Sequence, residues 1–76
     1  MHPSVLRSRI QFLREQVETS RLYCASFPTK FQAAQTEDER TEIAFHYNEA
    51  LQQTYRLEML LETLERSERE QRYNGN

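Results

Sequence analysis

A heptad stripe in the second half of the chain is the feature that most constrains the fold. Apolar or small residues recur there in alternating steps of four and three, the spacing that holds one stripe of an α-helix against a partner helix. This C-terminal stripe comprises Ile43, Tyr47, Ala50, Thr54, Leu57, Leu61 and Leu64. The pattern predicts a long helix that packs along its length against another helix.

The first half of the chain carries a matching stripe. This N-terminal stripe follows the same alternating steps and comprises Leu6, Ile10, Leu13, Val17, Ser20, Cys24 and Phe27. Two helices with equal stripes and a short connection fold back on each other. The expected fold is therefore all-α: an antiparallel two-helix hairpin, coiled-coil-like, that dimerises into a four-helix bundle.

Local signals indicate where the first helix begins. Pro3 suits the first turn of a helix, where no amide donor is needed, and His2 or Ser4 is the expected cap. The residue before a proline avoids the helical region, so Phe27 before Pro28 predicts a break in the chain.

Thr36 followed by Glu39 forms a capping box, which predicts the start of the second helix. Residues 71–76 are polar and are expected to fray. The predicted organisation is a single domain over 1–76, with a helix over about 3–26, a connection over about 27–36, a helix over about 37–70 and a tail over 71–76.

Aligning the two stripes predicts which residues face each other across the hairpin. The alignment that fills every layer places Ser20 opposite Ala50 and brings Arg14 near Glu58. Exposed charge pairs of this kind select a register more than they add stability.

Composition limits both the core and the classes of partner. Only 37% of the 76 residues are hydrophobic, so two helices alone bury little apolar surface. The net charge of −2 gives no general attraction to nucleic acid or to anionic membranes. With a lone cysteine, no signal-peptide pattern and no apolar run of ~18 residues, a cytoplasmic location is expected.

Large apolar side chains also occur outside the two stripes, and they suggest a second packing surface. The candidate partner-binding residues are Val5, Phe12, Phe45, Tyr55, Met59 and Leu60. A second copy of the chain or a helix of another protein would cover them. Alternatively they are scattered surface residues, or Phe31 and the connection cover them.

Catalytic and metal-binding interpretations find little support in the residue pattern. Cys24 and His46 are the single nucleophile–base combination, and a small buried thiol is the simpler interpretation of Cys24. Glu42, His46 and Glu49 share one helical face, but their spacing differs from the Glu-x-x-His pattern of di-iron bundles. We therefore expect no catalytic, cofactor-binding or metal-binding residue and no small-molecule substrate.

Arginines form a basic edge on the first helix. Arg7, Arg14 and Arg21 recur every seven residues and Arg9 lies close by. Pairing with acidic residues of the second helix explains this edge without a nucleic acid, and no recognised nucleic-acid-binding motif accompanies it. The sequence thus favours a non-enzymatic helical protein–protein interaction module, such as an adaptor, chaperone or regulator, with a small nucleic-acid-associated regulator as the alternative.

Overall fold

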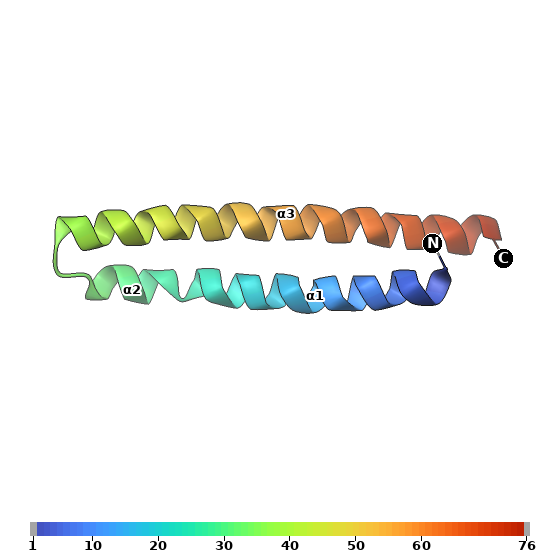
Figure 1. Ribbon diagram of the computed structural model, residues 1–76, viewed down its shortest axis with the longest axis horizontal. Helices are drawn as coiled ribbons and strands as arrows, with labels where there is room; N and C mark the ends of the chain where they lie inside the picture. The colour runs from blue at the N-terminus through green and yellow to red at the C-terminus, as the bar shows by residue number, and fades with distance from the viewer. Residues whose placement is uncertain (1, 76) are drawn as a thin grey trace.

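The chain forms a helical hairpin. A computed structural model describes residues 2–75, which form the helices α1 (Pro3–Ala25), α2 (Phe27–Ala33) and α3 (Glu37–Gly75) and no strand. Helices α1 and α2 follow one another along one arm, and α3 returns antiparallel to them as the other arm (Figure 1). The predicted all-α hairpin is confirmed.

The connection predicted over about 27–36 is shorter in the structure, because a short helix takes up most of it. Residues 27–33 are helical, so only residues 34–36 join the two arms. Pro28 lies in the first turn of α2, where a missing amide proton costs nothing, so the same proline that ends α1 also begins α2. Ser26 marks the break between these helices, and its hydroxyl donates to the carbonyl of Tyr23 at 2.6 Å.

The predicted end of the second helix near residue 70 is wrong. Helix α3 continues through Gly75, and Asn76 lies outside the described residues. The residues from Glu65 to Arg72 are mostly acids and arginines, and Arg72 pairs with Glu68 one turn earlier. Such pairs support a helical end that has no apolar partner.

Side-chain caps fix the first turns of both long helices. The Nδ1 atom of His2 accepts the backbone N–H of Ser4 at 3.2 Å, which confirms His2 as the cap of α1. The hydroxyl of Thr36 accepts the N–H of Glu39 at 3.1 Å, which confirms half of the capping box. The Glu39 carboxylate accepts from the N–H of Gln35 at 2.9 Å, one residue before the position that the motif predicts.

The core lies along the seam between the two arms. Its buried hydrophobic residues all belong to the two stripes and are Leu6, Ile10, Leu13, Val17, Phe27 and Ala50. Thr54 is the buried polar residue, and the leucines of the C-terminal stripe are only half-buried. The core is therefore one layer thick, with α3 less completely covered than α1.

The register differs by one layer from the predicted one. The Ser20 hydroxyl is hydrogen-bonded to that of Thr54 rather than lying opposite Ala50. Arg14 pairs with Glu65 at 2.9 Å rather than with Glu58. The seam contact places α3 about one helical turn further along α1 than the stripe alignment predicted, and the partner of Arg14 lies seven residues beyond the predicted glutamate.

Chemical matching within the layers accounts for this shift. Equal heptad stripes still match after a shift of one layer, so apolar spacing does not choose between the two registers. The observed register places the Thr54 hydroxyl beside Ser20, where both groups are hydrogen-bonded, instead of against Val17. It also brings Phe31 of α2 beside Ile43, which adds a layer at the turn.

The result is a rod. It measures 59 × 14 × 14 Å, and its radius of gyration of 17.3 Å exceeds the value of about 11 Å for a compact domain of this length. None of the helices in residues 2–75 is both long and apolar enough to cross a membrane.

Candidate interaction surface

Ion pairs between the two arms define one side of the rod. Arg14 reaches Glu65 at 2.9 Å and Arg21 reaches Glu58 at 3.1 Å. We write the stripe positions alternately d and a, starting with d at Leu6 in the first half of the chain and at Ile43 in the second. In this notation the four paired residues all occupy position e of their heptads. Each pair is exposed and contributes about 0.2–1 kcal/mol, so together they mark this ion-pair side more than they stabilise it.

The opposite side carries several large apolar side chains. It is formed by heptad positions c and g, which hold Val5, Phe12 and Tyr23 on α1 and Leu60 on α3. Within residues 2–75 no ion pair joins the two arms on this side. We call it the apolar side.

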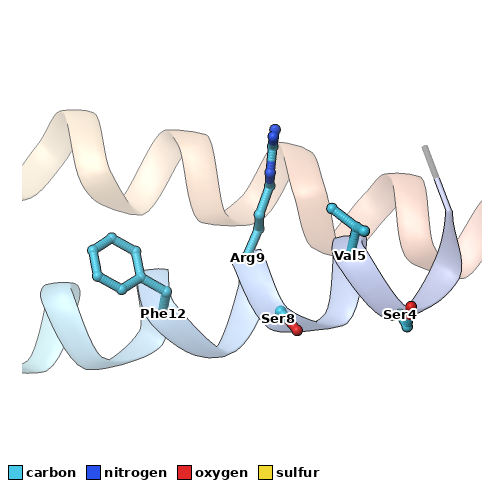
Figure 2. A pocket seen from close by; sticks show the side chains of 5 residues that line it. All are labelled: Ser4, Val5, Ser8, Arg9 and Phe12. Atoms are coloured by element: carbon cyan, nitrogen blue, oxygen red, sulfur yellow. The ribbon is translucent and has the colours of Figure 1, made fainter.

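The α1 part of the apolar side forms a shallow hollow. Figure 2 shows Val5 and Phe12 on the same side of α1, with the Arg9 side chain extending between them towards α3. The hollow has a volume of about 350 Å³, and Ser4 and Ser8 complete its lining. Its walls are mostly apolar, and Arg9 is the one charged residue of its lining.

The structure brings together only some of the six candidate partner-binding residues. All six are exposed, from 45% for Val5 to 65% for Tyr55. Val5, Phe12 and Leu60 share the apolar side. Phe45 and Met59 occupy position f, on the outer face of α3, and the remaining residue, Tyr55, borders the ion-pair side.

An aromatic cluster at the turn was missed in the sequence. The Tyr23 ring lies edge-on to Phe27 with centroids 5.0 Å apart, and Phe27 lies 5.2 Å from Tyr47. The Lys30 ammonium lies 4.7 Å from the Tyr23 centroid and 4.6 Å from that of Phe27. The signal was the spacing of Tyr23, Phe27 and Lys30 by about one and two turns, which places them on one face once 27–33 is helical.

A pocket between α2 and α3 was missed for the same reason. Its volume is about 370 Å³, and its lining includes Phe27, Pro28, Phe31, Ile43, Ala44 and Tyr47. Phe31 therefore lines a pocket at the turn. Phe12 and Phe45 remain 59% and 62% exposed, so the interpretation that Phe31 and the connection cover them is wrong.

The cysteine and the histidine have separate surroundings. The Cys24 sulfur lies 3.4 Å from the Thr54 hydroxyl, inside the seam. His46 is exposed between two carboxylates, with its Nε2 atom 3.8 Å from Glu42 and its Nδ1 atom 3.4 Å from Glu49. No hydrogen bond connects Cys24 with His46 in the described part of the chain.

Metal-ligand side chains do not converge in the described structure. Among residues 2–75, no group of three or more His, Cys, Asp or Glu side chains is arranged to hold a metal ion.

The basic edge is divided between the two sides of the rod. Arg14 and Arg21 are engaged by glutamates of α3, as the intramolecular interpretation predicts. Arg7 lies on the same side, whereas Arg9 lies on the apolar side, and neither forms an ion pair within residues 2–75. Two of the four arginines proposed to contact nucleic acid are therefore already paired with glutamates of the same chain.

Comparison with known proteins adds no family to this geometry. No protein-family model matches the chain, and neither a curated protein nor a solved structure is similar enough to count as a match.

Proposed function

We propose that this chain is a non-enzymatic protein–protein interaction module that acts by helix-face docking. Its exposed apolar side chains bury against helices of a partner, and in the simplest case a second hairpin supplies them and completes a four-helix bundle. The proposed role is that of a cytoplasmic adaptor, chaperone or regulator.

The imbalance between buried and exposed apolar side chains carries this proposal. The rod has an accessible surface of 6096 Å², about a quarter more than a compact protein of its mass exposes. Six apolar residues are buried, whereas Phe12, Phe45 and Tyr55 are each more than half exposed. Covering such residues is the main favourable term available to a chain with so thin a core.

The docking mechanism follows from the rigidity of the rod. Continuous helices hold the exposed side chains at fixed spacings, so little conformational entropy is lost when a partner helix binds. A partner with apolar residues at helical spacing would place them between Val5, Phe12 and Leu60, and the surrounding polar residues would remain hydrated at the rim.

Replacing Phe12 and Phe45 by Asp tests the proposal. A carboxylate at either position opposes burial against a partner helix, and neither side chain contributes to the buried core. We expect the double variant to remain helical by circular dichroism, to sediment as a monomer and to lose captured protein in a pull-down. Leu22→Asp is the matched control, because Leu22 is equally exposed at 67% and lies outside the six candidates.

Unchanged sedimentation, melting temperature and capture in the double variant would show that this surface binds nothing. The nucleic-acid alternative is tested separately by a salt-dependent gel shift. Retardation that disappears in the Arg14→Glu, Arg21→Glu variant, with the fold retained, would support that alternative instead.

A further inference from the structure

We infer that two copies of this chain pair through the apolar side with their long axes parallel, turn beside turn, so that α1 and α2 of each copy lie against α3 of the other. This arrangement rests on the function proposed above and specifies its partner. The occupant of the apolar side is a second copy related by a two-fold axis along the rod.

The two arms carry opposite charge on the apolar side. Positions c and g of α1 and α2 hold Arg9 and Lys30 and no acid, a net charge of +2. We call them the basic row. The same positions of α3 from residue 40 to residue 73 form the acidic row, with a net charge of −2 when His46 is neutral. Its charged residues are Glu42, Glu49, Arg56 and Glu70.

A two-fold axis allows the two rods to run either parallel or antiparallel, and the charged rows distinguish these two arrangements. If the rods ran antiparallel, the two-fold axis would cross them, and each row would face its own copy, basic on basic and acidic on acidic. With parallel rods, each basic row faces the acidic row of the second copy. Opposed rows of like charge cost free energy at an interface, so the parallel arrangement is favoured.

The register of the hairpin gives the opposed charges matching positions. Long side chains lean towards the N-terminus of their own helix. In an antiparallel pair, a charged residue therefore reaches a partner that lies a few residues further along the second helix than the residue directly opposite it. Because Ser20 lies opposite Thr54, Arg14 lies opposite residue 60, and its partner Glu65 is five residues further along α3. On the apolar side, Glu70 lies at the same offset from Arg9.

Lys30 and Glu49 show the same offset as Arg9 and Glu70. Neither pair forms an ion pair inside one hairpin. The glutamates occupy position c, which points outwards from the groove of their own hairpin. Glu70 is therefore available to the basic row of a second copy, whereas Glu49 also lies 3.4 Å from His46 of its own helix.

The apolar residues match across the same interface. Phe12 lies eight residues before Ser20, so it is level with about residue 62, which lies eight residues after Thr54. Residue 62 is within one turn of Leu60. Phe12 of each copy would thus pack on Leu60 of the other. One side of a 59 × 14 Å rod covers about 800 Å², the area that each partner of a standard-size interface buries.

Distances between spin labels at the turn test the arrangement. The Cys24→Ser, Gln35→Cys variant carries one label on the exposed turn residue Gln35. In the parallel dimer both turns lie at the same end, and we expect an inter-label distance of about 20–30 Å, set by interhelical spacings near 10 Å and the label arms. Antiparallel rods would separate the labels by about the 59 Å length of the molecule.

Charge reversal supplies the second measurement. Arg9→Glu should raise the dimer dissociation constant about tenfold, because two symmetry-related ion pairs are lost and repulsion replaces them. Adding Glu70→Arg should restore it. Arg69→Glu makes the same change of charge at position b, bordering the ion-pair side, and should leave the constant unchanged.

Each outcome separates this arrangement from the proposed function. A dimer with labels near 59 Å would overturn the parallel pairing and leave helix-face docking intact. A monomer at tens of micromolar would overturn self-pairing, and the Phe12, Phe45 variant would then decide whether the surface binds any other protein. Equal effects of Arg9→Glu and Arg69→Glu would overturn the assignment of the two rows.

Discussion

Thr54 links side-chain chemistry to the register of the hairpin. Its hydroxyl proton is donated to the carbonyl of Ala50, one turn earlier, at 2.8 Å. A hydroxyl has a single proton, so its contacts with Ser20 and Cys24 require those two residues to be the donors. One buried oxygen thus joins α3 to two successive turns of α1.

Thr54→Val should measure the contribution of this oxygen. The substitution keeps the side-chain shape but leaves the half-buried Ser20 hydroxyl without its acceptor. We expect the free energy of unfolding to fall by about 1–2 kcal/mol. The corresponding decrease in melting temperature, followed by circular dichroism, is about 4–8 °C for each kcal/mol.

Thr63→Val provides the matched control. Thr63 makes the same type of bond within α3, to the carbonyl of Met59 at 3.0 Å, but it is exposed and, among the described residues, forms no hydrogen bond to α1. Its replacement should change stability by no more than about 0.5 kcal/mol. Equal losses in both variants would show that the bonds across the seam add nothing.

Among the elements, α2 takes up most of the predicted connection. A proline after an aromatic residue predicted the end of a helix, and α1 does end there. The following residues form another helix because Pro28 suits a first turn and because the Phe27 ring packs between Tyr23 and Tyr47. Contact with α3, rather than local propensity, stabilises so short a helix.

The pairing of α1 with α3 is tested by double-mutant cycles. Arg14→Ala and Glu65→Ala should show a coupling energy of about 0.2–1 kcal/mol in urea unfolding, reduced at high salt, because their side chains form an exposed ion pair. Arg14→Ala with Glu58→Ala should show none. A coupling energy between Arg14 and Glu58 in place of Glu65 would show that the hairpin has the register expected from stripe spacing alone.

At the scale of the whole molecule, shape decides what the protein needs. A rod 14 Å across exposes one face of every helix, so its interior holds only the residues of the seam. Stability that depends on a second rod should then depend on protein concentration.

The melting temperature should therefore rise by about 3–6 °C for each tenfold increase in protein concentration. Dilution favours the dissociated chains by mass action, and differential scanning calorimetry across two decades of concentration measures the effect. Phe12→Asp should flatten this dependence and lower the melting temperature to the value of the dilute protein. A concentration-independent melting temperature in the unmodified chain would indicate a hairpin that is stable alone.

Local patterns in the sequence were sufficient for the two long helices, the hairpin and the members of the core. Alternating steps of four and three place residues on one face of a helix whatever lies around it, so Leu6 and Ala50 were assigned to the seam correctly. The caps at His2 and Thr36 are equally local, because each involves atoms within three residues.

Only the tertiary structure decided the register and the two sides of the rod. A heptad repeat matches itself after a shift of one layer, so the choice depended on which polar groups meet across the seam, namely Ser20 and Thr54. That choice assigned Arg14 to Glu65, and this ion pair marks one side of the rod. Contacts between residues far apart in the chain have no signature in local periodicity, and for this reason the structure was needed to locate the ion-pair side and, opposite it, the candidate surface.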